Sequence, residues 1–178
     1  MNMKLNNKGF TLIELLAAMV ILAAIMAIAV PNVLGILNNS KADAYVEDAK
    51  KLLSLAEYKF RANPSFRPPQ NQCTVMSLNY LDNSEFDNAP NNGKYDKTNS
   101  YVIIVNQPTA AGKNQYLYYV TIDEILTDGS HRGIAYKSYE QLYGNEPGDL
   151  IQNGGSGELA KPDAAISHVS CNSIYTSL

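Results

Sequence analysis

The hydrophobic residues of this chain are concentrated in one run near its beginning. Between Phe10 and Val30 only Thr11 and Glu14 have polar side chains. About 20 consecutive apolar residues are enough for an α-helix to cross the hydrocarbon core of a bilayer. The run therefore predicts a helix that is apolar on every side and that lipid or other protein must cover.

A narrower apolar stripe follows this run. Apolar residues recur there at helical spacing, with charged residues between them: Tyr45, Ala49, Leu52, Leu53, Ala56 and Phe60. This pattern is typical of an amphipathic helix that packs one face and solvates the other. Asn63-Pro64 ends the pattern, because a residue before proline avoids the helical conformation. We expect one helix over residues 10–62, apolar over 10–37 and amphipathic over 38–62.

The remainder of the chain, residues 63–178, has the composition of a β-sheet head rich in turns. Residues 101–105 are β-branched and aromatic, and residues 115–122 alternate in polarity, with a turn-like segment at 109–114 between them. This arrangement predicts a β-hairpin, and a third strand is expected near 133–136. The predicted fold class is α+β, with a long N-terminal helix packed on an antiparallel β-sheet head.

Other segments mark the loops and the end of the head. Ser138 followed by Gln141 has the spacing of a helix capping box and predicts a short helix there. Residues 166–174 predict a last strand at the edge of the sheet. Stretches rich in proline, asparagine or glycine predict loops at 64–69, 82–99 and 144–157.

The distribution of charge predicts how the apolar helix is oriented across the membrane. Lys4 and Lys8 precede the apolar run, and the next basic residue is Lys41. The positive-inside rule then predicts a cytoplasmic N-terminus, with everything after the run outside. The net charge is −3, and a mature chain without Lys4 and Lys8 would have twelve basic against seventeen acidic residues. Nucleic acid is not an expected partner, because phosphate contacts need clustered positive charge.

The segment Lys8-Gly9-Phe10-Thr11-Leu12-Ile13-Glu14, followed by the apolar run, resembles the processing site of type IV prepilins and the related pseudopilins. In that family a membrane peptidase cuts between the positions that match Gly9 and Phe10 and then methylates the new amine of Phe10. The resemblance implies a leader at residues 1–9, a transmembrane and filament-core helix at 10–37, and a head at 63–178.

Glu14 needs an explanation, because an acid inside a bilayer helix costs about 2.5–3.5 kcal/mol on insertion scales. The resemblance implies that Glu14 of an incoming subunit meets the terminal amine of Phe10 in a neighbour and sets the axial register of the filament. Opposite charges attract strongly in a low dielectric, which suits such a role. The alternative is an acid that is protonated or that reaches the membrane surface.

The resemblance also gives Pro31 and Gly35 a role. The matching family proline lies where the helix melts locally as subunits pack, and a nearby glycine would ease such melting. A helix kink without consequence is the alternative for Pro31.

Two cysteines lie in the part that would be exported, where a disulfide is chemically permitted. Many pilins pin their C-terminal region, so the resemblance implies a disulfide between Cys73 and Cys171 that ties the C-terminal segment to the connector. Two free thiols are the alternative. A zinc site that adds His131 and His168 is a weak third reading, because the ligands are scattered.

Sequence signals for catalysis are missing. The chain has two histidines and no nucleophile elbow, phosphate loop or HExxH signature. Residues 87–93 superficially resemble a calcium loop, but their glycine is misplaced and the closing acid is missing. We therefore expect no enzyme activity, no cofactor and no metal.

The predicted function is that of a structural subunit, taken to be the major pilin, of a type IV pilus. The precursor would span the membrane once, and the assembled protein would lie in a surface filament for adhesion, twitching motility or biofilm formation. Its partners would be copies of itself, the prepilin peptidase and methyltransferase, the pilus assembly platform and, before assembly, the membrane.

Three alternative functions stay open. A pseudopilin or minor pilin of a secretion or DNA-uptake system would have the same motif. Ala27-Ile28-Ala29 resembles a signal-peptidase site, and a cut there would release a secreted chain that begins at Val30. A single-pass membrane protein with a binding head is the third alternative.

Overall fold

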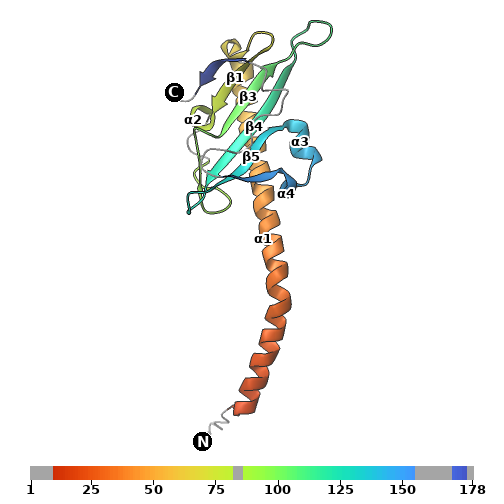
Figure 1. The fold of residues 1–178 in the computed structure, drawn as a ribbon, viewed down its shortest axis with the longest axis vertical. Coiled ribbons are helices and arrows are strands. Elements are labelled where there is room, and N and C mark those ends of the chain that lie inside the picture. The colour runs from red at the N-terminus through yellow and green to blue at the C-terminus, as the bar shows by residue number, and fades with distance from the viewer. Residues whose placement is uncertain (1–9, 82–85, 155–169, 176–178) are drawn as a thin grey trace, which may run out of the picture. The chain divides into compact units, whose positions relative to one another are not determined.

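The long N-terminal helix is continuous. The computed structural model describes residues 10–81, 86–154 and 170–175. Helix α1 extends from Leu12 to Ala62 and passes through Pro31 without a break (Figure 1). Contacts divide the chain into two compact units, Met1–Asn38 and Asn39–Leu178, so α1 contributes to both.

The second unit contains the other described elements. A short 3-10 helix, η1 (Pro64–Phe66), follows α1, and the side chain of Asn63 caps it. The remaining elements in chain order are β1 (Gln72–Ser77), α2 (Leu78–Leu81), β2 (Lys94–Tyr95), β3 (Tyr101–Asn106), β4 (Tyr116–Ile125), β5 (His131–Ser138), α3 (Tyr139–Gly144), α4 (Pro147–Leu150), β6 (Ile151–Gly154) and β7 (Ser170–Tyr175).

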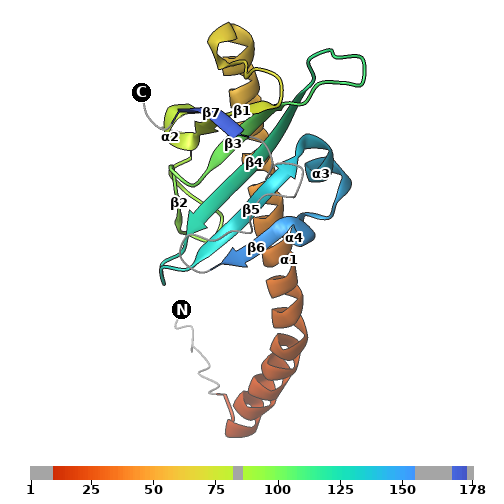
Figure 2. The same ribbon diagram turned by 45° about the horizontal axis from the view of Figure 1, so that its top comes forward.

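The strands form one sheet in the order β6-β5-β4-β3-β1-β7, with β2 beside β4 off this path (Figure 2). Strands β3 and β4 pair antiparallel, with Tyr101 opposite Thr121 and Asn106 opposite Tyr116, so the predicted hairpin is confirmed. Strand β7 is an exception to the expected antiparallel sheet, because it pairs in parallel with β1. A parallel pair needs a long crossover connection, and no turn signal in the sequence reports it.

The second half of α1 packs on one face of this sheet. The whole predicted stripe is buried: Tyr45, Ala49, Leu52, Leu53, Ala56 and Phe60. Alternate residues of β3 and β4 complete the same core: Val102, Ile104, Val120 and Ile122. The ring of Phe60 meets that of Tyr116 edge-on, with 4.8 Å between centroids. The predicted α+β fold is therefore confirmed.

Regular structure occupies part of each of the three segments predicted as loops, and η1 lies within 64–69. Residues 144–157 contain α4 and β6, because Leu150 is buried in the main core and Ile151 packs against it. Strand β2 lies within 82–99, and β1 was not predicted at all. The predicted capping box before α3 is confirmed, since Ser138 Oγ accepts from Gln141 N–H and Gln141 Oε1 accepts from Ser138 N–H. Of the last predicted strand, residues 166–169 lie outside the described residues.

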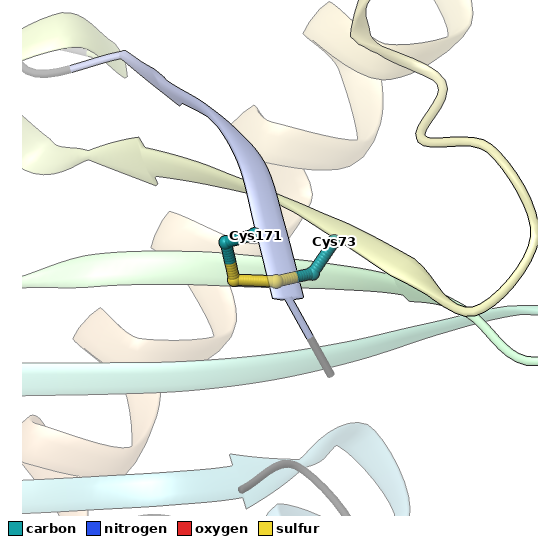
Figure 3. The surroundings of a disulfide bond; sticks show 2 residues. All are labelled: Cys73 and Cys171. Atoms are coloured by element: carbon teal, nitrogen blue, oxygen red, sulfur yellow. A yellow bond between two sulfur atoms is a disulfide. The ribbon is translucent and has the colours of Figure 1, made fainter. Parts of the chain in front are cut away.

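A disulfide joins Cys73 of β1 to Cys171 of the edge strand β7 (Figure 3). The two residues face each other in the parallel pair, with Cα atoms 4.3 Å apart, although 98 positions separate them in the chain. Cys73 lies on the sheet face opposite to α1, in a second cluster with Ile103 and Val105. The bond therefore fixes the C-terminal strand to the inner part of the sheet.

Candidate functional site in the N-terminal segment

The start of α1 is a reciprocal capping box. Glu14 Oε2 accepts hydrogen bonds from the backbone N–H and from the hydroxyl of Thr11, each at 2.8 Å. In return the N–H of Glu14 donates to Thr11 Oγ1 at 3.3 Å. These bonds satisfy donors that the first turn of a helix leaves unpaired. Sequence reasoning missed this role of Glu14, although the Thr-x-x-Glu spacing signals it.

The capping bonds use only one oxygen of the Glu14 carboxylate. Both end on Oε2, and within the described residues Oε1 accepts no hydrogen bond. The arrangement therefore leaves an oxygen of Glu14 open to a cation from outside the helix.

The helix that follows presents apolar side chains on all sides. Every large apolar side chain from Leu12 to Leu37 is at least half exposed, from 50% at Leu37 to 83% at Leu12. The helix is long and apolar enough to cross a membrane, judged by length and composition. Such a surface is unstable in water, so lipid or other protein must cover it.

Pro31 and Gly35 lie inside this apolar helix. Proline has no N–H, so Pro31 cannot donate to the carbonyl one turn earlier. One residue on, the side-chain amide of Asn32 donates to the carbonyl of Ile28 at 3.1 Å. A Cβ at Gly35 would meet no atom within 4 Å. Packing within the described part of α1 therefore does not require glycine at position 35.

Most of the predicted site residues lie apart from one another. Gly9 lies outside the described residues, and Phe10, the first of them, is 90% exposed. Glu14, Pro31 and Gly35 follow along α1 in the first unit. Of the predicted site residues that the structure describes, it brings together only the two cysteines, in the second unit.

In the second unit a buried acid fixes a loop to α1. Glu124 has no exposed surface, and its carboxylate accepts a hydrogen bond from the hydroxyl of Tyr45. The N–H groups of Asn91 and Gly93 donate to Glu124 Oε1 at 3.1 and 2.8 Å. A Cβ at position 93 would lie 2.6 Å from that oxygen, so the close approach requires glycine. Burial, then the hydrogen bond and charge of Glu124, raise the pKa of Tyr45, which keeps its hydroxyl a donor.

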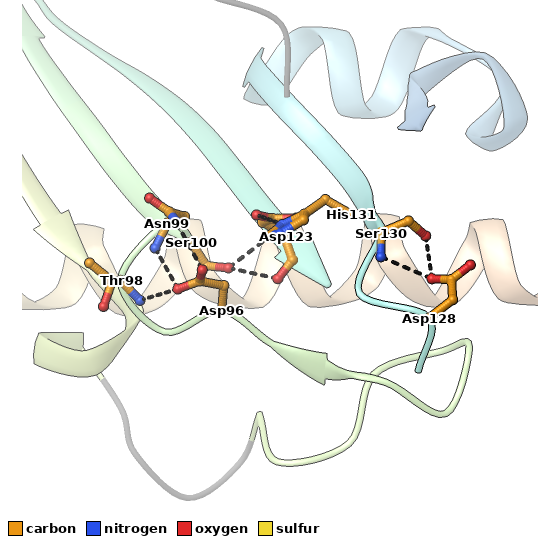
Figure 4. A network of polar contacts seen from close by, with 8 residues as sticks. All are labelled: Asp96, Thr98, Asn99, Ser100, Asp123, Asp128, Ser130 and His131. Atoms are coloured by element: carbon orange, nitrogen blue, oxygen red, sulfur yellow. Dashed lines mark hydrogen bonds and ion pairs between the residues drawn. The ribbon is translucent and has the colours of Figure 1, made fainter. Parts of the chain in front are cut away.

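The neighbouring acid, Asp123, points to the other face of the sheet, because adjacent residues of a strand alternate. Its Oδ2 lies 2.7 Å from Nδ1 of His131, and both side chains are buried (Figure 4). Burial raises the pKa of Asp123, although the hydrogen bond and charge of His131 act in the opposite direction. Two adjacent acids within one strand were the sequence signal for buried carboxylates, and sequence reasoning missed it.

Asp96 lies close to this pair, and its pKa is shifted in the opposite direction to that of Asp123. Burial raises its pKa, but hydrogen bonds from the backbone and side chain of Asn99 and from the N–H of Thr98 outweigh burial, and the pKa falls below its usual range. Asp96 thereby holds the turn before β3 in place (Figure 4). Asp96, Asp123 and His131 therefore all have structural partners within the head.

The metal readings find no support from the described residues. Among them, no group of three or more His, Cys, Asp or Glu side chains is placed to hold a metal ion. Zinc binds thiolates, and the disulfide occupies both Cys73 and Cys171. His168, the other candidate ligand, lies outside the described residues. In the segment that resembles a calcium loop, Asp87 pairs with Lys97 at 3.1 Å.

Residues 4–30 match the family described as the prokaryotic N-terminal methylation motif. No curated protein and no solved structure matched the chain. The matched residues include the predicted cleavage site, the capping box and most of the apolar half of α1. The chain therefore has the motif of type IV prepilins and pseudopilins, a family of structural subunits that prepilin peptidase processes and that polymerise. The motif and the apolar helix together fit a membrane-anchored precursor.

Proposed function

We propose that this chain is the major pilin of a type IV pilus, a structural subunit without enzyme activity. The peptidase cuts the precursor after Gly9, methylates the amine of Phe10 and leaves α1 as the assembly element. Copies of the chain then polymerise through α1 into a surface filament that serves adhesion, twitching motility or biofilm formation. The match at residues 4–30 supports the processing steps.

One observation supports the polymerisation step above the others. Among the residues that the structure describes, none covers the apolar half of α1, since every large apolar side chain from Leu12 to Leu37 is at least half exposed. A bilayer satisfies this surface in the precursor, and the same surface on other copies satisfies it in a filament. One helix therefore serves first as membrane anchor and later as filament core.

Glu14 supplies register in this proposal. Cleavage leaves a cationic amine at Phe10, and a carboxylate of another copy is a suitable partner for it in an apolar core. The helix cap uses Oε2 of Glu14, so Oε1 is available for that partner. An acid left unpaired in the core would be costly, so subunits in the wrong register are disfavoured.

Pro31 and Gly35 supply a place where α1 opens. The ladder of backbone hydrogen bonds already lacks the donor of Pro31, and glycine stabilises a helix by about 1 kcal/mol less than alanine. We propose that α1, continuous in the free chain, loses helical structure around these residues when subunits pack in the filament. Hydrogen-exchange measurements on monomer and filament test this, and equal protection of residues 31–35 in both states contradicts it.

The intact mass and N-terminal sequence of the chain taken from cells test the whole proposal. The expected product begins at a methylated Phe10 and is the predominant protein of sheared surface filaments. A start at Val30 would identify a secreted protein, and an uncut Met1 would identify a plain membrane anchor. A correctly processed chain that is only a trace component of filaments would contradict its assignment as the major pilin.

A further inference from the structure

Tyrosine side chains line a hollow on the surface of the second unit. Tyr118 of β4 and Tyr139 of α3 wall a cavity of about 270 Å³, which Leu53, Ser54 and Glu57 of α1 complete. The cavity lies between three elements that the core already fixes, so its walls are formed before any ligand arrives.

A second cavity adjoins the first. It has a volume of about 350 Å³ and shares Tyr118 and Tyr139 with the first cavity. Tyr116, Tyr119 and Glu140 also line it. The two shared tyrosines therefore line both hollows, whose volumes lie near the lower end of the range for small-molecule sites.

Neighbouring side chains pack against the aromatic rings. Phe60 packs against Tyr118, with ring centroids 5.8 Å apart. The rings of Tyr139 and Tyr143 are tilted at 4.6 Å, and the hydroxyl of Tyr139 donates to that of Tyr143 at 3.0 Å. Lys50 Nζ lies 4.1 Å from the centre of the Tyr143 ring. Tyr139 nevertheless remains 53% exposed, so an ordered aromatic surface faces solvent.

Ion pairs hold two of the charged side chains around the cavities. Glu57 Oε1 forms an ion pair with the guanidinium of Arg61 at 2.5 Å, and Glu47 Oε1 forms one with Lys50 Nζ at 3.0 Å. Glu140 is exposed, where solvent and salt screen its charge. Burial, then the charge of Glu57, raise the pKa of Tyr118 to about 12, so its hydroxyl stays protonated at physiological pH. The surface therefore offers hydroxyl groups and aromatic rings, with a small negative charge from Glu140 at the second cavity.

We propose that Tyr118 and Tyr139 form the centre of a binding site for a neutral oligosaccharide, with one sugar ring in each cavity. The C–H groups on the face of a sugar ring are weakly positive, and they stack on the negative face of an aromatic ring. Sugar hydroxyls find donors and acceptors in the tyrosine hydroxyls and in the carboxylate of Glu57. The proposal does not depend on filament assembly, because all the residues involved lie in one unit of the chain.

Two other ligand classes fit the surface less well. A quaternary ammonium ion also binds aromatic faces, but Arg61 already neutralises Glu57 at the first cavity. A proline-rich peptide lies along an extended aromatic groove, whereas the tyrosines here line two hollows of about 270 and 350 Å³. A neutral sugar chain suits the ion-paired acid of the first cavity and the presence of two hollows.

Saturation-transfer NMR on the full chain tests the site, in a detergent without a sugar headgroup. The probes are a panel of neutral hexose and N-acetylhexosamine oligosaccharides, with tetraethylammonium and a proline-rich peptide as competitors. The variant Tyr139→Ala removes the exposed wall that both cavities share. Tyr58→Ala is the matched control, because Tyr58 is 72% exposed and lines neither cavity.

We expect at least one oligosaccharide to bind saturably, with affinity about tenfold weaker in Tyr139→Ala and unchanged in Tyr58→Ala. Tyr139→Phe keeps the ring and should retain most of the affinity. Three results would overturn the proposal. The first is no binding across the panel, and the second is binding that Tyr139→Ala leaves intact. The third is that one of the two competitors binds more tightly than every sugar and displaces all of them. Circular dichroism of each variant confirms that the head is folded.

Discussion

Thr11 and Glu14 close the first turn of α1 on each other, through two hydrogen bonds to Glu14 Oε2 and one from the N–H of Glu14 to the hydroxyl of Thr11. The acid that the sequence singles out for its charge is thus also a helix cap. The two roles are separable, because a neutral amide at the third helical position caps a helix as glutamate does but has no charge.

Glu14→Gln and Glu14→Ala should both leave cleavage after Gly9 intact and both reduce surface filaments more than about tenfold. The reason is that each variant lacks the charge for the amine of Phe10, and a charge-assisted hydrogen bond contributes about 1.5–3 kcal/mol. Filament yield in sheared fractions measures assembly, and the intact mass of the chain measures cleavage after Gly9. Wild-type filament yield in Glu14→Gln would show that Glu14 acts as a cap and not as a charge.

Thr11→Val provides the complementary control. It removes the hydroxyl that bonds to Glu14 while the carboxylate remains. Loss of a cap costs about 0.5–2 kcal/mol of helix stability, which a long helix anchored in lipid tolerates. Filaments should therefore form at close to normal yield. A loss as severe as that of Glu14→Ala would assign the assembly defect to the cap.

Reduction of the Cys73–Cys171 bond should destabilise the head by about 2–4 kcal/mol, because the bond closes a loop of 98 residues. Tyrosine fluorescence follows head unfolding selectively, since every tyrosine lies at or beyond Tyr45 and the chain has no tryptophan. The double variant Cys73→Ala with Cys171→Ala should unfold at the lower temperature whether or not reductant is present. Equal melting of oxidised and reduced wild type would show that the bond adds no stability.

Asp96→Asn should cost stability at neutral pH and little at low pH. The lowered pKa of Asp96 means that its carboxylate stabilises the folded state at and above the usual aspartate range, and that this contribution is lost as pH falls from that range through the lowered pKa of the folded state. Urea unfolding of wild type and variant across this range measures the difference. A difference in the free energy of unfolding between wild type and variant that stays constant with pH would contradict this role of the Asp96 carboxylate.

Asp123→Asn should show the opposite trend. The raised pKa of Asp123 means that the folded state binds its proton more tightly than the unfolded chain does. Wild type therefore loses stability relative to the variant as pH rises above the usual aspartate range. The same urea titrations test this, and His131→Gln in the Asp123→Asn background controls for the imidazole. A wild-type advantage that grows with pH would contradict the prediction.

Gly133→Ala should unfold the head or destabilise it beyond the roughly 1–3 kcal/mol typical of overpacking. A Cβ at this position would lie 1.9 Å from the carbonyl oxygen of Ile122, a backbone atom that cannot move without breaking the β4–β5 pair. Gly144→Ala is the control, because a Cβ there meets no atom within 4 Å. Thermal melting followed by tyrosine fluorescence compares them, and equal melting temperatures would exclude a tight contact at Gly133.

The sequence predicted the fold best where local periodicity is sufficient. The stripe from Tyr45 to Phe60 and the hairpin around residues 109–114 depend on spacing between near neighbours, and the structure confirms both. The strands that sequence reasoning missed, β1, β2 and β6, are short or begin within loop-like composition. What makes them strands is their partners: β3, β4 and β5, respectively.

The N-terminal sequence by itself determined the processing motif, the apolar anchor and the place of Glu14 within it, because these depend on contiguous residues. Tertiary structure alone decided that Cys73 meets Cys171 through a parallel strand pair, that Glu124 is buried under Tyr45, and that Tyr118 and Tyr139 line the same surface cavities. Each of these pairs joins residues distant in the chain. Their contact depends on strand order and register, which the packing of the whole core selects and no local pattern encodes.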